Sequence, residues 1–313
     1  MERPMSFHEE LEAKTKQAEE ILQKYLPDKE EAYQKTVMDA MCYSAMAGGK
    51  RLRPVLMKEC FTLFGGTGEV IEPFMAALEM IHNYSLVHDD LPAMDNDEYR
   101  RGKLTTWKVY GECMAILAGD GLLNLAFETA SQAFQILDKE PAADPAQQLK
   151  NYKAVGKAMQ ILSKKAGIYG MIGGQTADIE AEGRTDLTEE LLLFIHEHKT
   201  AALMECAMMI GAALAGASQT DIEKMERAAS NIGIAFQIQD DILDITSTTE
   251  VLGKPVGSDE KNHKLTYVRL HGIEESKQQV KELSEEAVEI LRSFETKNEF
   301  LVELVEQLVN RQK

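Results

Sequence analysis

The sequence predicts an all-α protein folded as a single domain. Apolar residues recur at helical spacing from the start of the chain, as at Phe7, Leu11 and Ala18, while alternating β-branched runs are almost absent. The composition, with 16 Met and only 8 Pro in 313 residues, favours long uninterrupted helices over a turn-rich β protein. With 44% hydrophobic residues, the chain is long enough to bury a large core.

Glycine and proline clusters divide the chain into roughly ten predicted helices. In chain order, the breaks fall at Pro27-Asp28, Gly48-Gly49, Gly65-Gly66, Asp138 to Ala146, Gly183, Gly216, Gly253 to Gly257, and Gly272. The Asp138 to Ala146 segment, DKEPAADPA, is the one plausible linker, but it is short and the composition does not change across it. We therefore expect one domain over residues 1–313.

Two of the predicted helices have a distinctive composition. Residues 72–87 (EPFMAALEMIHNYSLV) are mostly apolar and lead directly into a run of aspartates. Residues 203–215 (LMECAMMIGAALA) are apolar on nearly all sides, so this helix must be buried on every side. Either the core of one chain or an interface between subunits would satisfy that requirement.

The charge and cysteine content exclude several classes of protein. The net charge of −18 disfavours nonspecific binding to nucleic acid or anionic lipid, so an anionic substrate needs local positive charge or a metal. The four cysteines are widely scattered and have no zinc-ligand spacing. The N-terminus lacks an apolar signal region, and no stretch of eighteen uncharged apolar residues follows. We expect a soluble, cytoplasmic protein with neither a membrane span nor a nucleic-acid partner.

Two acidic clusters are the strongest functional signal. The first, HDDLPAMDND, directly follows the predicted helix at residues 72–87 and contains Asp89, Asp90, Asp95 and Asp97. The second lies in the helical stretch NIGIAFQIQDDILDIT and contains Asp240, Asp241 and Asp244. A spacing of four places Asp240 and Asp244 one turn apart on one face, which Gln237 shares.

Clustered carboxylates of this kind call for a cation. They repel one another, and at the end of a helix the macrodipole adds to the cost. Oxygen ligands suit magnesium, which binds through a few carboxylates, several waters and substrate phosphates. A solvated acidic face would explain either cluster alone, but Ile234, Phe236 and Ile238 make the second segment too apolar for free solvation. The two clusters together predict a magnesium-bridged diphosphate.

Basic residues accompany both clusters. Gly48-Gly49-Lys50-Arg51-Leu52-Arg53-Pro54 combines a flexible double glycine with three cations, although it lacks the spacing of a Walker loop and could be a surface turn. Arg100 and Arg101 follow the first cluster, and Lys254 and Lys264 follow the second. In so acidic a chain, this alternation of carboxylates and cations is what binding of metal-bridged diphosphates requires.

These motifs resemble those of the trans-isoprenyl diphosphate synthases, and in particular of the bacterial farnesyl diphosphate synthases (geranyltranstransferases). The matching segments occur in family order and cover most of the chain: GGKRLRP, IHNYSLVHDDLPAMDNDEYRRGK, GGQTAD, HKT, FQIQDDILD and GKPVGSD. The resemblance implies a helical bundle around a deep central cavity, of the isoprenoid synthase type, that is usually a homodimer. The two aspartate motifs would face each other across the cavity mouth.

The resemblance also implies a role for each motif residue. The main magnesium ligands would be Asp89, Asp95 and Asp240, supported by Asp90, Asp241 and Asp244. The allylic diphosphate would be held by Arg100, Lys199, Lys254 and Lys264. Isopentenyl diphosphate would be held by Lys50, Arg53, His82 and Arg101. Thr200 and Gln237 would face the carbocation that forms between the two substrates.

The implied reaction is a head-to-tail condensation of isopentenyl diphosphate with an allylic diphosphate. Magnesium and the cations would stabilise the departing diphosphate, and apolar walls would exclude water from the carbocation. Tyr84, five residues before Asp89, suggests a fifteen-carbon farnesyl product, with geranylgeranyl or geranyl diphosphate as alternatives.

A noncatalytic partner subunit would have lost metal ligands, and a terpene cyclase would lack the second aspartate motif. Leu104 and Trp107 stand where the family often has proline and histidine.

Overall fold

The computed structural model describes residues 5–28, 31–182, 184, 186–246 and 266–309. These residues are almost entirely helical, which confirms the predicted fold class. The elements are α1 (Phe7–Tyr25), α2 (Lys35–Ala45), α3 (Leu52–Leu63), α4 (Glu72–Asp89), β1 (Tyr99–Arg100), β2 (Lys103–Leu104), α5 (Thr106–Tyr110), α6 (Glu112–Lys139), α7 (Pro145–Ala166), α8 (Met171–Ala181), α9 (Glu189–Ile195), the π-helix η1 (His196–Ala201), α10 (Ala202–Leu214), α11 (Gln219–Thr246), α14 (Tyr267–His271), α15 (Ile273–Ser293) and α16 (Glu299–Val309).

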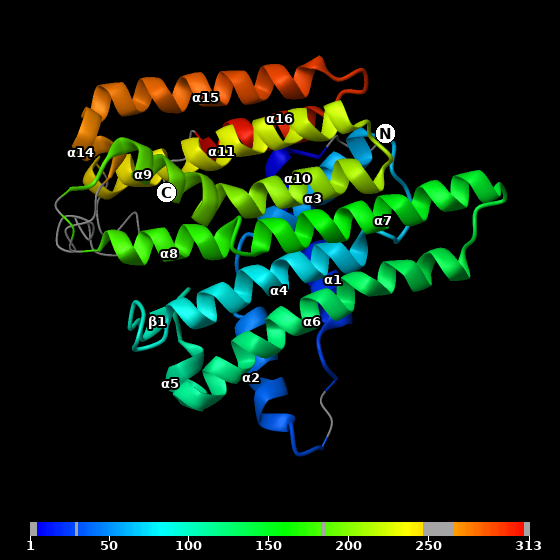
Figure 1. Cartoon of the computed structure of the whole chain (residues 1–313), viewed down its shortest axis with the longest axis horizontal. Coiled ribbons are helices and arrows are strands. Elements are labelled where there is room, and N and C mark those ends of the chain that lie inside the picture. The colour runs from blue at the N-terminus through cyan, green and yellow to red at the C-terminus, as the bar shows by residue number, and fades with distance from the viewer. Residues whose placement is uncertain (1–4, 29–30, 183, 185, 247–265, 310–313) are drawn as a thin grey trace.

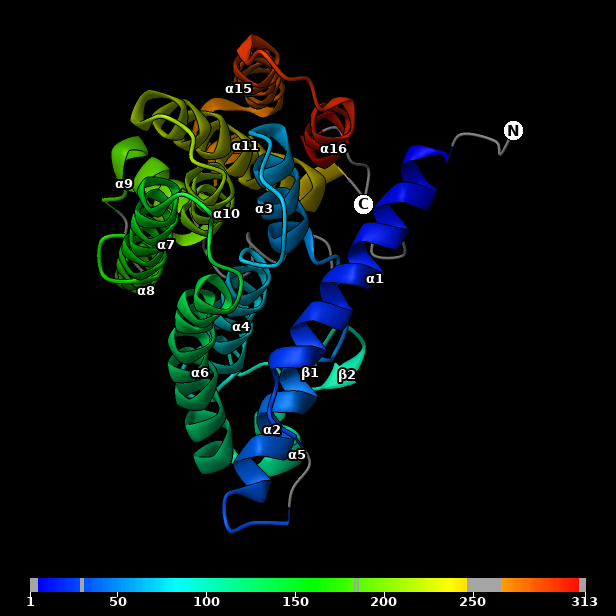
Figure 2. The same cartoon turned by 90° about the vertical axis from the view of Figure 1, so that its right-hand side faces the viewer.

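The long helices form a bundle whose members run roughly side by side (Figure 1). Seen from the end of the bundle, α10 lies between α3, α7 and α11 (Figure 2), and it packs against all three. Every residue from Ala202 to Ala213 is buried within the chain. The strongly apolar helix is therefore a core helix, and the alternative that it forms an interface between subunits is wrong.

Most predicted breaks coincide with helix ends. For example, α1 ends before Pro27, α3 ends before Gly65, and α10 ends before Gly216. The breaks predicted at Gly183 and at Gly253 to Gly257 lie outside the described residues. The sequence did not predict the end of α7 at Ala166, the start of α8 at Met171, or the short antiparallel β1–β2 hairpin.

The β1–β2 hairpin turns through Arg101 and Gly102, which have φ angles of 53° and 74°. Two central residues with positive φ are typical of the type I′ turn, whose twist matches that of paired strands. The hairpin therefore reverses the chain directly after the first acidic cluster and returns it to α5.

Helix α6 is the one helix in the described part of the chain that is long and apolar enough to cross a membrane, judged by length and composition alone. Its buried face includes Ala115, Ala118 and Leu122, and it packs along α4. Small residues on that face let the two helix backbones approach closely. This packing accounts for the apolar composition of α6 within the bundle.

Candidate active site

The first acidic cluster begins at the last residue of α4. Asp89 ends the helix, and its Oδ1 accepts a hydrogen bond of 2.8 Å from Nε2 of Gln175 in α8. The following turn folds back, because the Asp95 amide donates to the Asp89 carbonyl over 2.9 Å. The predicted ligands Asp89 and Asp95 are thus joined through one backbone turn at the end of α4.

Asp90 is held by Arg100 from the β1–β2 hairpin. Nε of Arg100 donates a hydrogen bond of 2.7 Å to Asp90 Oδ1. Nη2 of the same guanidinium lies 2.6 Å from the same oxygen. Burial raises the pKa of Asp90, while the hydrogen bond and charge of Arg100 oppose that shift. Arg100 Nη2 also lies 3.6 Å from Asp97 Oδ2. Arg100 therefore connects both ends of the acidic segment.

Helix α8 links the first acidic cluster to Lys199. The Lys199 ammonium forms an ion pair with Asp178 Oδ2 over 2.5 Å, and Asp178 lies three residues after Gln175 on α8. Burial lowers the pKa of Lys199, but Asp178, Asp89 and Asp95 raise it, with a net upward shift. Lys199 is therefore a fully charged ammonium beside the carboxylates of the first cluster.

The π-helix η1, which carries Lys199 and Thr200, is packed between two glycines. A Cβ on Gly174 of α8 would lie 2.1 Å from the Lys199 backbone nitrogen. A Cβ on Gly233 of α11 would lie 2.3 Å from Cβ of Ala201. Only glycine permits such close approach, and single π-turns within helices are frequent at functional sites. The two glycines thus fix where η1 presents its side chains.

Helix α11 meets η1 through Gln237, whose Oε1 accepts a hydrogen bond of 3.1 Å from the Thr200 hydroxyl. The same helix carries the second acidic cluster. Asp241 and Asp244 are buried, at 4% and 3% exposure. Asp241 Oδ2 also accepts a hydrogen bond of 2.9 Å from the Tyr267 amide, which anchors the start of α14. Helix α11 is therefore attached both to η1 and to the chain that follows.

A concentrated positive charge lies where the double glycine meets the hairpin. Arg101 Nη1 donates to the Gly48 carbonyl, and a Cβ on Gly49 would lie 2.8 Å from the Arg101 guanidinium carbon. Nε of Arg53 is buried without a hydrogen-bond partner. The pKa of His82 is lowered well below its usual value, first by burial and then by Arg53 and Arg101. This cluster can receive an anion with several acceptor oxygens.

The three cations of GGKRLRP have different surroundings. Arg51 is 2% exposed and donates to Glu79 Oε1 over 2.7 Å and to the Ala45 carbonyl over 2.8 Å. Lys50 is exposed, and Arg53 belongs to the positive cluster described above. Arg51 is therefore a structural residue, which leaves Lys50 and Arg53 available to a ligand.

Tyr84 lies in α4, just over one turn before Asp89. It is 6% exposed, its ring meets His88 edge-on at a centroid distance of 5.8 Å, and its buried hydroxyl has no hydrogen-bond partner. Burial, with a contribution from Asp89, raises the pKa of Tyr84 to about 12. The side chain is thus a neutral, largely apolar wall beside the first acidic cluster.

The acidic residues suit a hard divalent cation because all their donors are oxygens. The pKa of Asp89 is raised to about 6, first by burial and also by the charges of Asp95 and Asp90, while Lys199 and Arg100 oppose the shift. A bound cation would relieve this repulsion. In the described part of the chain, no three His, Cys, Asp or Glu side chains are grouped closely enough to hold a metal by themselves. The donor set therefore fits a cation completed by water and phosphate oxygens.

Two predicted site residues, Lys254 and Lys264, lie outside the described residues. Conversely, the sequence assigned no role to Gln175 and Asp178, which hold Asp89 and Lys199. Their signal was present in GGQTAD, where two polar side chains three residues apart share a helix face and follow a double glycine. What they contact could be seen only once the helices were assembled.

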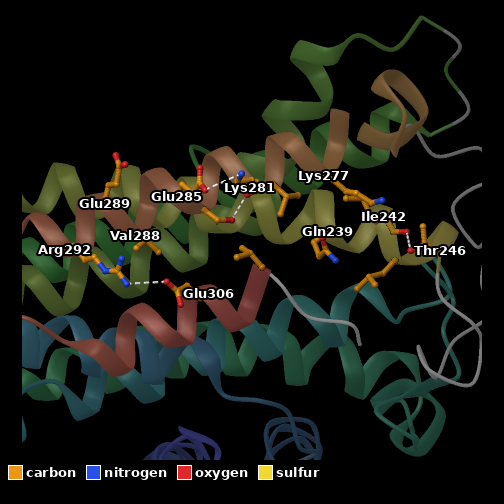
Figure 3. A pocket seen from close by; sticks show the side chains of 14 residues that line it. Gln239, Ile242, Thr246, Lys277, Lys281, Glu285, Val288, Glu289, Arg292 and Glu306 are labelled. Atoms are coloured by element: carbon orange, nitrogen blue, oxygen red, sulfur yellow. Dashed lines mark hydrogen bonds and ion pairs between the residues drawn. The ribbon is translucent and has the colours of Figure 1, made fainter. Parts of the chain in front are cut away.

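A separate groove of about 1120 Å³ lies between α11, α15 and α16 (Figure 3). Gln239, Ile242 and Thr246 line it from α11, and on its rim Arg292 lies 3.6 Å from Glu306. No aspartate of the second acidic cluster lines this groove, because those residues occupy other positions around the α11 helix. The groove is therefore distinct from the candidate active site.

Comparisons with known proteins agree with this geometry. Residues 34–307 match the polyprenyl synthetase family. The chain is 47% identical to a geranylgeranyl diphosphate synthase of Cyanophora paradoxa over 277 residues, which cover 88% of this chain and 87% of that protein. It is 43% identical to a farnesyl diphosphate synthase of Geobacillus stearothermophilus over 272 residues, which cover 87% of each.

Solved structures show the same fold over almost the whole chain. A crystal structure of an FPP/GFPP synthase from Zymomonas mobilis superposes with a TM-score of 0.82 and 30% identity, covering 97% of this chain and 98% of that one. A geranyltransferase structure from Legionella pneumophila gives a TM-score of 0.81 and 31% identity, covering 98% and 97%.

Proposed function

The chain belongs to the polyprenyl synthetase family and is a prenyltransferase, and on this premise we propose that it makes farnesyl diphosphate. The substrates are isopentenyl diphosphate and an allylic diphosphate, first dimethylallyl and then geranyl diphosphate. The observation that carries the proposal is the junction of α4, α8, η1 and α11. It joins Asp89 to Gln175, Lys199 to Asp178, and Thr200 to Gln237.

In this proposal the allylic diphosphate binds between the two acidic clusters, beside Arg100 and Lys199. Arg100 and Lys199 lie beside the first cluster and supply positive charge to the departing diphosphate. Lys254 and Lys264, outside the described residues, belong to the same proposed set. Fixed cations stabilise negative charge as the carbon–oxygen bond breaks, so no protein nucleophile is required.

Magnesium is the proposed cofactor, held by Asp89, Asp95 and Asp240 with support from Asp90, Asp241 and Asp244. When bound, it would neutralise charge on the leaving diphosphate as a Lewis acid. The raised pKa of Asp89 and the all-oxygen donor set support this assignment.

Isopentenyl diphosphate binds at the positive cluster. Arg53 and Arg101 grip its phosphate oxygens, together with the exposed Lys50, and neutral His82 donates a hydrogen bond. The unpartnered Nε of buried Arg53 supports this role, because a buried donor without an acceptor is costly unless a ligand supplies one.

The carbocation forms between the two diphosphate sites. The Thr200 hydroxyl and the Gln237 side-chain carbonyl present oxygen dipoles that stabilise positive charge without acting as strong nucleophiles. The double bond of isopentenyl diphosphate attacks the allylic carbon, a new carbon–carbon bond forms, and the released diphosphate accepts the proton lost from the adduct. Buried apolar walls exclude the water that would otherwise capture the cation.

The fifteen-carbon product rests on Tyr84, a buried aromatic side chain just below Asp89. A geranylgeranyl product is the second candidate, because several relatives at 44–47% identity are geranylgeranyl diphosphate synthases. The chain is similar to both farnesyl and geranylgeranyl diphosphate synthases, so similarity does not decide the product length. In this proposal, the side chains that line the product site decide it.

The test is to incubate the purified chain with magnesium, isopentenyl diphosphate and dimethylallyl diphosphate, and to identify products by chromatography and mass. A farnesyl product supports both the reaction and the role of Tyr84. A twenty-carbon product keeps the reaction but rejects Tyr84 as the floor. A folded chain that forms no product with any allylic substrate would overturn the proposal in favour of a noncatalytic partner subunit.

The enzyme is also proposed to be a homodimer. Helices α6, α7 and α8 lie on the left side of the molecule in Figure 2. Large apolar side chains are exposed there, including Ile116 and Leu117 of α6 at 45% and 49%, and Tyr169 at the α7–α8 junction at 72%. Neighbouring exposed apolar side chains of this kind are typical of surfaces buried in an assembly.

A further inference from the structure

Trp107 stands where the family often has histidine, and its contacts concern the first acidic cluster. The indole Nε1 donates a hydrogen bond of 2.8 Å to the backbone carbonyl of Asp97. The Thr105 hydroxyl donates to the same carbonyl, also over 2.8 Å. One backbone oxygen of the acidic segment thus accepts two side-chain hydrogen bonds from the start of α5.

Thr105 makes this contact with its side chain instead of capping the N-terminus of α5. It is the N-cap residue of α5, where a threonine hydroxyl usually accepts a hydrogen bond from a helix amide. Here the side chain makes no such capping bond, although Thr105 is only 2% exposed. Both lone pairs of the Asp97 carbonyl are thereby used, which restrains the carbonyl in direction as well as in position.

Trp107 and Thr105 together form a clamp on the Asp97 carbonyl, and further contacts hold this clamp in place. The Lys108 ammonium lies 4.7 Å from the centre of the Trp107 ring and 2.6 Å from Glu98 Oε1. The Thr105 amide donates to the Glu98 carbonyl over 3.0 Å, and the Tyr43 hydroxyl donates to the Leu104 carbonyl over 2.7 Å. The returning strand of the hairpin is therefore attached to α2 as well as to the acidic segment.

The clamped carbonyl lies between two groups of the candidate site. Asp97 is two residues after Asp95, and its carboxylate faces Arg100 at 3.6 Å, while Arg100 in turn holds Asp90. A restraint on the Asp97 backbone therefore limits the freedom of Asp95 on one side and of Arg100 on the other.

We propose that Trp107 and Thr105 are positioning residues that hold the segment from Asp95 to Arg100 in its ligand-binding form before metal and diphosphate arrive. This inference rests on the proposed function, since it concerns the same metal and allylic diphosphate site. Neither residue touches the substrates. They act by lowering the conformational freedom that binding would otherwise have to remove.

The test compares Trp107→Phe, Thr105→Val and the double variant with the wild-type enzyme. Phe keeps an aromatic ring but loses the N–H donor, and Val keeps the shape of Thr but loses the hydroxyl. The matched control is Tyr152→Phe, which removes a side-chain hydrogen bond to Asp138 between α6 and α7. Thr105→Val keeps the proposal testable if the ring substitution fails to fold.

Each single clamp variant should raise the half-saturating magnesium concentration and the KM for geranyl diphosphate by about two- to tenfold, the usual effect of one lost hydrogen bond. The turnover number at saturation should stay within about twofold, because the lost interaction serves binding. In the double variant, the increase in each of these two constants should exceed the product of the increases in the single variants. The reason is that the Asp97 carbonyl is then left without either donor. Parameters that match those of Tyr152→Phe would overturn the proposal.

Two measurements do not depend on turnover. In metal-free protein, hydrogen exchange at the Asp95, Asn96 and Thr105 amides should be faster in the clamp variants, because these amides are hydrogen-bonded within the segment. Trp107 is the only tryptophan in the chain, so its fluorescence reports on this contact. In the wild-type protein its emission maximum should stay nearly unchanged when magnesium and inorganic diphosphate are added together, because the segment already has its ligand-binding form. Unchanged exchange in the double variant, or a large shift of the emission maximum in the wild-type protein, would contradict the inference.

If the wild-type enzyme forms no prenyl product, the proposed function fails. Exchange and fluorescence would still show whether Trp107 and Thr105 order the acidic segment. If product forms normally but the clamp variants behave like the control, the inference alone is wrong.

Discussion

At the scale of single residues, several side chains of the site are fixed by partners from other parts of the chain. Asp89 accepts a hydrogen bond from α8, Asp90 is paired with the hairpin, and Thr200 is bonded to α11. Buried polar groups held in this way lose little further freedom when a ligand binds. Substitutions at such residues should therefore affect chemistry more than folding.

Asp89→Ala and Asp240→Ala should each lower turnover by more than about a hundredfold, because each removes a proposed metal ligand. Folding should be intact by circular dichroism, since the change also relieves repulsion among carboxylates. Asp28→Ala, at an exposed aspartate away from the site, is the control. Near wild-type turnover in either active-site variant would disprove the metal assignment.

Tyr84→Ala should lengthen the main product beyond fifteen carbons, because it removes a buried aromatic wall near Asp89. It should also destabilise the fold by about 3 kcal/mol, as is usual for an aromatic-to-alanine change in a core. Tyr84→Phe is the matched control and should keep the product, since the hydroxyl has no partner. Mass analysis that finds the same product in both variants would place the floor elsewhere.

Buried His196 should make the free energy of unfolding depend on pH. Burial lowers its pKa from 6.5 to about 4, so the unfolded chain takes up a proton first as the pH falls. The stabilisation of the folded state by neutral His196 is complete above pH 6.5 and is lost as the pH falls toward 4. The free energy of unfolding should therefore fall by about 2 kcal/mol between pH 7 and pH 5. In His196→Gln, urea unfolding at the two pH values should show a correspondingly smaller difference. An unchanged difference would refute the assignment.

At the scale of elements, the site depends on the close packing of η1 against α8 and α11. A π-turn is less regular than an α-helix and needs tertiary contacts to persist. Gly174 and Gly233 allow these contacts by omitting a side chain at each surface. The irregular turn is thus stabilised by its neighbours rather than by its own sequence.

Gly174→Ala should disturb η1, because the added Cβ would lie 2.1 Å from the Lys199 nitrogen and backbone must move. Turnover should fall at least about tenfold through displacement of Lys199 and Thr200. Gly156→Ala in α7 is the matched control: it has no atom within 4 Å of the added Cβ and should leave turnover unchanged while stabilising the helix by about 0.5–1 kcal/mol. Equal activities in kinetic assays would contradict this role of Gly174.

At the scale of the whole molecule, the bundle has a central core helix, and some of its outer helices expose large apolar side chains. Helix α10 is covered by its neighbours, whereas α6 and the α7–α8 junction keep large apolar side chains exposed. The burial of α10 means that it has no face left for a second subunit. If the chain dimerises, the surface must come from the outer helices.

Light scattering after size-exclusion chromatography should give the mass of a dimer for the wild-type chain. Leu117→Glu should shift it toward the monomer by placing a charge within a buried apolar interface. Leu270→Glu, at another exposed leucine on α14, should leave the mass unchanged. A wild-type mass equal to that of one chain would reject the dimer.

The sequence alone determined the helical class, most helix ends, and the position of both acidic clusters. These features are local: periodicity, glycine and proline breaks, and carboxylate spacing act over a few residues. Tertiary structure decided that Arg51 is structural while Arg53 faces the positive cluster, and that Gln175 and Asp178 support the site. It also decided that α10 is core and that Trp107 contacts the acidic segment. Each of these depends on contacts between residues far apart in the chain, which no local pattern specifies.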